Sequence, residues 1–248
     1  MKINNWCTTA CGNSGKPVVA CRTIFFCWIA ATVVFVSCNI GNEKLPGTVE
    51  VLKQESQTLP YLGQHDVEFK AGENGVLTPD TAYYTITKFV FTNQYGKEIS
   101  HRDYEGKIYV TDFFFTTCPS ICPVMSAQLA RLQDLLKKEN HWGEVKILSH
   151  TVDPTHDTPE VLKVYAEKLG ADLQHWNFVT GKAEEIYTQA QQGYFLTAMP
   201  SDTAAGGFFH SDMVALVDRN SHLRGFYDGT STREIDSLFI DIKTLLNE

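Results

Sequence analysis

The feature that most constrains the fold is an apolar segment, KIYVTDFFF at residues 107–115, followed at once by a cysteine pair and a helical pattern. The nearly continuous apolar run predicts a central strand buried on both faces. The next residues, TTCPSICP, hold Cys118 and Cys122. After them apolar side chains recur at spacings of four, three and four: Met125, Leu129, Leu132 and Leu136. That spacing predicts an amphipathic helix directly after the cysteine loop.

Strands and helices alternate through the rest of the chain. Strands are predicted at 144–152, 176–180, 213–217 and 222–228, and helices at 157–170, at 182–192 and from 231 onward. Thr158 and Gly170 are the expected cap and terminator of the first of these helices, and STRE at 231–234 is a capping box. Upstream, the alternation of 87–91 and the turn NQYG predict a hairpin ending near residue 100.

This order predicts an α/β sandwich with a central mixed sheet flanked by helices, and with an N-terminal hairpin extension. A strand, a cysteine loop and a helix in succession form the opening of the thioredoxin fold. Asp112, six residues before Cys118, stands inside the apolar strand as a buried aspartate does in thioredoxins. A charge at the solvated edge of the strand is the equal alternative.

The first 38 residues predict an export signal or an anchor. An uncharged apolar run spans 24–38, with Lys16 and Arg22 before it. The run ends in FVSC, which resembles the lipobox of bacterial lipoproteins, with Phe35 in place of the usual leucine. Cys38 would then carry the lipid; an uncleaved membrane anchor and plain secretion are the alternatives. All three place the domain outside the cytoplasm, in the cell envelope if the chain is anchored.

The expected organisation is a signal or anchor at 1–38, a polar linker at 39–58 and one domain at 59–248. The formal net charge is −8 and there is no basic stripe, so nucleic acid is an unexpected partner. A monomer is the default expectation. Only two of the seven cysteines lie in the domain. In an oxidising compartment, such a pair is a structural bridge, a redox couple or a set of metal-bound thiolates.

The spacing of the pair favours a metal. Residues four apart share a helix face, so both sulfurs are expected to point together toward an exposed helix start, where backbone N–H groups and the helix dipole lower thiol pKa values. A disulfide is sterically feasible but closes too small a loop to stabilise much. Three residues separate Cys118 and Cys122, one more than in the C-x-x-C motif of dithiol oxidoreductases, and this wider gap between the sulfurs suits a bound metal better than a cycling disulfide. Two thiolates favour Cu(I) or Zn(II) and need a third ligand.

Histidine is the natural third ligand, and His210 is the candidate by position. It follows the Gly- and Ala-rich loop 197–209, which we expect to be mobile, and it precedes the predicted strand 213–217. In a thioredoxin fold, the loop before that strand packs against the cysteine pair. Of the other seven histidines, those near turns and strand ends are expected at the solvated surface.

Three segments together resemble the Sco/SenC family of membrane-anchored copper chaperones: FFFTTCPSICP, VDPTHDTPEVLKVYAEKLG and FHSDMVALVDRNSHLRGFYDG. The resemblance covers the chain from about residue 59 to its end. It implies a thioredoxin-like fold and copper, as Cu(I) or Cu(II), bound by Cys118, Cys122 and His210. It also implies delivery of copper to the Cu(A) centre of cytochrome c oxidase, or reduction of that centre's cysteines. Another exported copper protein is the alternative recipient.

Two positions depart from the family pattern. Ser120 replaces a frequent acidic residue, and His150 stands where a smaller side chain is expected. Asp153 matches the family's aspartate and is expected to cap the following turn. A metallochaperone is the favoured function. A thiol–disulfide oxidoreductase, with Cys118 attacking and Cys122 resolving, is the alternative, and a redox or copper sensor is the third. The chaperone needs His210; the oxidoreductase does not.

Overall fold

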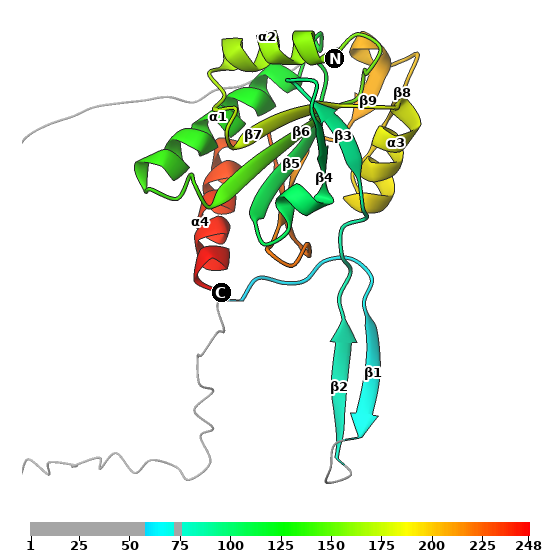
Figure 1. Ribbon diagram of the computed structural model, residues 1–248, viewed down its shortest axis with the longest axis vertical. Coiled ribbons are helices and arrows are strands. Elements are labelled where there is room, and N and C mark those ends of the chain that lie inside the picture. The colour runs from blue at the N-terminus through cyan, green and yellow to red at the C-terminus, as the bar shows by residue number, and fades with distance from the viewer. Residues whose placement is uncertain (1–57, 72–75) are drawn as a thin grey trace, which may run out of the picture. The chain divides into compact units, whose positions relative to one another are not determined.

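The computed structural model describes residues 58–71 and 76–248, so Cys38, the segment 1–38 and nearly all of the predicted linker lie outside the described residues. A mixed sheet of seven strands in the order β11-β10-β5-β6-β7-β3-β4 forms the domain's centre (Figure 1). Its strands are β3 (Val90–Asn93), β4 (Glu98–Ser100), β5 (Ile108–Phe114), β6 (Val145–Thr151), β7 (Trp176–Thr180), β10 (Met213–Val217) and β11 (Leu223–Asp228). Strands β5, β6 and β7 are parallel; the others pair antiparallel.

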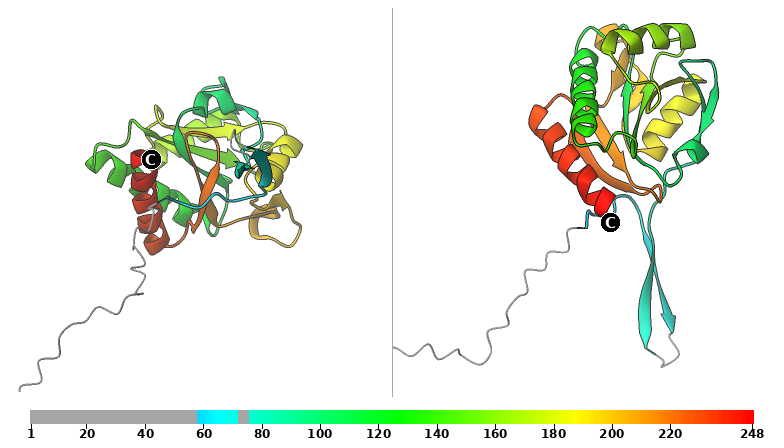
Figure 2. Two further views of the ribbon diagram at one scale, coloured as in Figure 1. Left: turned by 90° about the horizontal axis from the view of Figure 1, so that it is seen from below. Right: turned by 60° about the vertical axis from the view of Figure 1, so that its left-hand side comes forward.

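Helices cover both faces of this sheet. They are α1 (Cys122–Lys138), α2 (Pro159–Leu169), α3 (Ala183–Thr188), which continues into a π-helical turn at Gln189–Gly193, and α4 (Thr232–Asn247). Figures 1 and 2 show α1 and α4 side by side on one face, with α3 on the other. The predicted α/β fold with a mixed sheet is therefore confirmed. No helix in the described part of the chain has the length and apolarity needed to cross a membrane.

The predicted helix caps are confirmed. The hydroxyl of Thr158 accepts a hydrogen bond from the N–H of Val161, and Gly170 ends α2 in the left-handed conformation, with φ of 73°. Ser231 accepts from the N–H of Glu234 at the start of α4. Each cap satisfies backbone groups that a helix end leaves open, so the caps fix both ends of α2 and the start of α4.

Strand β5 is buried along its whole length, as a central strand should be. Asp112 lies within it and is fully buried, so the solvated-edge alternative is excluded. His150, on the neighbouring strand β6, is also fully buried and stacks on Phe113, with ring centroids 4.7 Å apart. His150, which stands where the family pattern has a smaller side chain, thus fills part of an aromatic core with its ring.

Hairpins account for the main differences from the expected fold. The predicted hairpin is β3–β4, and it joins the edge of the main sheet. Preceding it is a second, unpredicted hairpin, β1 (Asp66–Ala71) with β2 (Leu77–Ala82), which forms a separate two-stranded sheet. The segment before His210, expected to be a loop, instead forms a third hairpin, β8 (Ala198–Pro200) with β9 (Phe208–His210), which includes a short 3-10 turn at Ala205–Gly207.

Candidate metal centre

The cysteine pair lies where β5 gives way to α1. Strand β5 ends at Phe114, the N–H of Cys118 donates to the carbonyl of Phe115 at 3.2 Å, and Cys122 is the first residue of α1. Pro123 stands in the first helical turn, where no backbone donor is required. The predicted placement of both cysteines is therefore confirmed, and the second proline is accommodated by a regular helix start.

The hairpin β8–β9 brings His210 to the pair from 88 residues further along the chain. The Nε2 atom of His210 lies 3.1 Å from the Sγ of Cys122. The ligand atoms of Cys118, Cys122 and His210 all lie within 4.8 Å of one another, and within the described residues this is the one such group of three or more. The three side chains singled out from the sequence are thus brought together.

The tautomer of His210 suits a ligand. Its Nδ1 lies 3.0 Å from the backbone carbonyl of Ser211. A carbonyl accepts but cannot donate, so Nδ1 carries the proton, and the lone pair of Nε2 points toward the sulfur of Cys122. Metal-binding histidines are commonly oriented in this way by a hydrogen bond from the other ring nitrogen.

A glycine lets the hairpin lie close to the cysteine loop. Gly206 has φ of +80°, and a Cβ at this position would lie 2.7 Å from the ring of Phe115 and 3.4 Å from Pro119. The Phe115 ring also packs against Phe208 and lies edge-on to His210, with a centroid separation of 5.8 Å for the second pair. The small residues of this loop, which suggested mobility, instead allow close packing.

The sulfurs are buried rather than exposed, contrary to the sequence-based expectation. Cys118 is 7% exposed and Cys122 is fully buried. Both are free thiols. A pocket of about 160 Å³ is lined by Cys118 and His210 but not by Cys122, and no Lys, Arg, Asp or Glu lines it. Any acceptor of a bound ion must therefore approach through a small opening that carries no fixed charge.

The two thiols differ sharply in acidity. Burial by itself raises the pKa of Cys118, but hydrogen bonds from Cys122 and from the backbone of Ser120 outweigh it and lower that pKa to about 6. Burial raises the pKa of Cys122 above its ordinary value, and the hydrogen bond to Cys118 adds to the effect. Cys118 is thus the thiolate of the pair at neutral pH, and Cys122 keeps its proton.

A buried aspartate that the sequence did not single out holds the loop before Cys118. Asp157 accepts hydrogen bonds from the backbone N–H of Thr116 at 3.1 Å, from the Thr116 hydroxyl and from the hydroxyl of Thr151. No sequence pattern indicated this role, because Thr116 lies 41 residues away from Asp157. Asp153 does cap the following turn, as expected, by accepting from Thr155 and from the N–H of His156.

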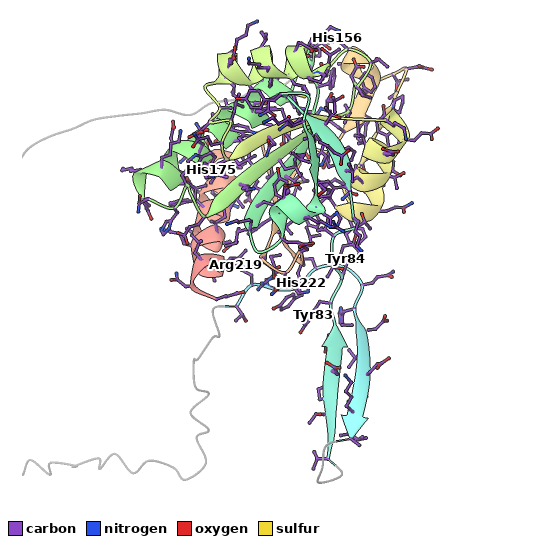
Figure 3. The ribbon with its side chains drawn as sticks, viewed as in Figure 1. Tyr83, Tyr84, His156, His175, Arg219 and His222 are labelled. Atoms are coloured by element: carbon purple, nitrogen blue, oxygen red, sulfur yellow. The ribbon has the colours of Figure 1, made fainter. Side chains whose placement is uncertain are left out.

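Two more buried ionisable groups lie in the strands behind the site. Asp112 accepts from the Ser149 hydroxyl at 2.5 Å, and its other carboxylate oxygen has no hydrogen-bond partner. Burial raises its pKa to about 6. Burial lowers the pKa of His150 to about 3, so that histidine is neutral. His156, in contrast, is exposed beside α2 (Figure 3).

Comparison with known proteins identifies the class. The SCO1/SenC family model matches residues 78–247, and the chain belongs to this family. The SCO1 protein homolog of Bacillus subtilis (strain 168) is 30% identical over 165 residues, which are 66% of this chain and 84% of that protein. A Stutzerimonas stutzeri protein whose name describes copper binding is 28% identical over 170 residues, 68% of this chain and 80% of its own.

Solved structures agree with the fold. The crystal structure of a SCO1/SenC family lipoprotein from Bacillus anthracis str. Ames has a TM-score of 0.61 and 33% identity, covering 66% of this chain and 95% of that one. The structure of BsSco has a TM-score of 0.59 and 31% sequence identity, and the match covers 65% of this chain and 93% of BsSco. It is described as a member of the Sco family of cytochrome c oxidase assembly proteins, with a disulfide switch. The thioredoxin-like Sco fold predicted from the sequence is confirmed.

Proposed function

We propose that the protein is a copper-binding metallochaperone and that Cys118, Cys122 and His210 hold the ion as cargo. The observation that carries the proposal is the convergence of three soft donor atoms within 4.8 Å. Two thiolates and an imidazole form a donor set suited to Cu(I), and the same residues offer nitrogen and sulfur to Cu(II). The relative of Stutzerimonas stutzeri named for copper binding supports the same cargo.

Loading would require little rearrangement of the protein's own groups. Cys118 is already the more acidic thiol, and Nε2 of His210 already lies 3.1 Å from the Sγ of Cys122. Cys122 must lose its proton, since the thiolate and not the thiol binds metals. Three protein ligands leave the ion accessible through the uncharged pocket, so an acceptor's ligands can replace them one at a time.

The proposed destination is cytochrome c oxidase. The protein would deliver copper to the Cu(A) centre or keep that centre's cysteines reduced. The relative described as a member of a family of oxidase assembly proteins supports this role. We propose that the domain lies outside the cytoplasm and is tethered to a membrane through Cys38, which is consistent with the related lipoprotein.

A thiol–disulfide oxidoreductase is the second candidate, favoured by the unequal thiols. A thiolate at Cys118 beside a protonated Cys122 is the arrangement of an attacking and a resolving cysteine. The disulfide switch described for BsSco supports redox chemistry at the pair as well. In this function His210 would not be required.

A transfer assay separates the two candidates. The anaerobic Cu(I)-loaded protein is mixed with the apo Cu(A) domain of an oxidase whose cysteines are reduced, and the optical spectrum of Cu(A) is followed after addition of Cu(II). Parent protein should restore the centre, and His210→Ala should restore much less. If His210→Ala performs as well as the parent, and both also reduce an oxidised Cu(A) domain, the oxidoreductase is the better description.

A further inference from the structure

The β1–β2 hairpin has two chemically different faces. In its register, Val67 pairs with Thr81, Phe69 with Pro79, and Ala71 with Leu77, so these side chains share one face. We call this set the apolar face. Asp66, Glu68, Lys70, Thr78 and Asp80 occupy the opposite face, where Lys70 and Asp80 form an ion pair. The hairpin is therefore amphipathic, and among the described residues no strand or helix buries its apolar side.

The exposure of the apolar face is large for a water-facing surface. Val67 is 46% exposed, Phe69 64% and Leu77 62%. At the base of the hairpin, Tyr83 directly follows β2 and its ring stacks on that of Tyr61, with centroids 3.8 Å apart; both tyrosines are partly exposed. Figure 3 labels Tyr83 and, near it, His222, which packs edge-on to both tyrosine rings. Contiguous exposed apolar surface of this kind marks a site of contact with a protein or a membrane.

The dimensions of the hairpin argue against a second copy as the occupant. Two six-residue strands span about 20 Å by 10 Å, and one face therefore offers about 200 Å². Stable interfaces between proteins bury about 800 Å² on each partner. A tethered protein needs much less surface to remain on a membrane, because the anchor already holds it there.

We infer that the apolar face of the β1–β2 hairpin rests on the surface of a lipid bilayer. The inference rests on the proposed tethering at Cys38. From that residue to Thr58, the first described residue, the chain spans 20 positions, which reach at most about 70 Å. The hairpin begins eight residues later, at Asp66. Aliphatic and phenylalanine side chains along one face, with tyrosines at its end, suit the boundary between acyl chains and headgroups.

The charges of the hairpin predict which lipid headgroups it prefers. Its described strands carry Asp66, Glu68 and Asp80 against a single Lys70. An acidic element is repelled by anionic lipid, so contact should be driven by apolar burial and should be strongest on zwitterionic lipid. This distinguishes the hairpin from the basic amphipathic segments that bind anionic headgroups.

Neighbouring positions on opposite faces provide the test. Full-length protein is reconstituted in phosphatidylcholine vesicles that contain nitroxide-labelled lipid, in the variants Phe69→Trp and Glu68→Trp. The native tryptophans of the tethered protein are common to both variants and to the parent, whose signal is subtracted. We expect the indole introduced at position 69 to be quenched at least about twofold more than the indole at position 68, with a blue-shifted emission. Replacing a third of the lipid by phosphatidylglycerol should reduce the difference.

Other outcomes overturn the inference. Equal quenching of the two indoles, or quenching of neither, would mean that the apolar face does not contact the bilayer. Emission at position 69 that depends on the protein-to-lipid ratio and not on the quencher would assign the face to a second copy. Flotation of the parent with the vesicles reports tethering separately, and the copper transfer assay is independent of both, so each proposal fails on its own.

Discussion

At the scale of single residues, two buried ionisable groups give the fold opposite responses to acid. His150 is neutral in the folded protein, with a pKa near 3, whereas an unfolded histidine titrates near 6.5. Acid therefore protonates the unfolded chain first, and stability falls as the pH drops below about 6.5. Asp112 has a folded pKa near 6, above its ordinary 3.8, so it adds stability as the pH falls from about 6 toward 3.8.

The His150→Phe variant should isolate the first effect. Phenylalanine has a similar shape and can keep the stack on Phe113, so the cost at pH 7 should stay below about 1.5 kcal/mol. When the pH falls from 7 to 5, protonation of His150 in the unfolded chain should lower the parent's free energy of unfolding by about 2 kcal/mol. The variant should not show this loss. Urea denaturation at the two pH values measures the difference. A variant that loses as much stability in acid as the parent would show that His150 is not the group responsible.

Asp157 should contribute to stability through the loop that carries Cys118. Asp157→Ala leaves the N–H and hydroxyl of half-buried Thr116 and the buried hydroxyl of Thr151 short of an acceptor, which should cost about 1–3 kcal/mol in unfolding free energy. Asp153→Ala removes only the cap of an adjacent, more exposed turn and should cost about 1 kcal/mol or less. Equal losses in urea denaturation would mean that the buried network adds nothing beyond an ordinary turn.

At the scale of elements, the β8–β9 hairpin positions His210. Substituting each of its two adjacent glycines can distinguish the cost of backbone strain from the cost of a lost close contact. Gly206 and Gly207 both have positive φ, but only at Gly206 would a Cβ meet Phe115. Gly207→Ala should cost about 1–2 kcal/mol in stability for its backbone alone. Gly206→Ala should cost more, because it also pushes the hairpin from the cysteine loop, and it should weaken Cu(I) binding. Calorimetry and a Cu(I) titration of both variants check this; identical behaviour would exclude the close contact as the cause.

Patterns local in sequence predicted most elements, and long-range packing explains the rest. Apolar periodicity located β5, β6, β7, β10 and the helices, and turn residues located β3–β4, because these signals lie within a few residues. The β8–β9 hairpin was missed because its strands have three residues each, and small residues there suggested mobility. The alternation of Val67, Phe69 and Ala71 could have revealed β1. Nothing local pairs Asp157 with Thr116, 41 residues away.

At the scale of the whole domain, one buried arginine joins the start of the described chain to its end. Arg224 on β11 donates to the backbone carbonyls of Leu59 and Pro60 and pairs with Asp218 and Glu248. The arginine is 2% exposed. A buried charge of this kind must be fully paired, because an unpaired one is strongly destabilising. The segment that leads to the β1–β2 hairpin is thereby fixed to the last helix.

The most direct test of the account is an anaerobic Cu(I) competition titration of the reduced protein beside His210→Ala and a control, His156→Ala, whose exposed histidine lies outside the trio. Parent and control should bind one copper with equal affinity. His210→Ala should lose at least about tenfold, or about 1.4 kcal/mol. Equal affinity in all three proteins, or weak binding by the parent, would contradict a site formed by Cys118, Cys122 and His210.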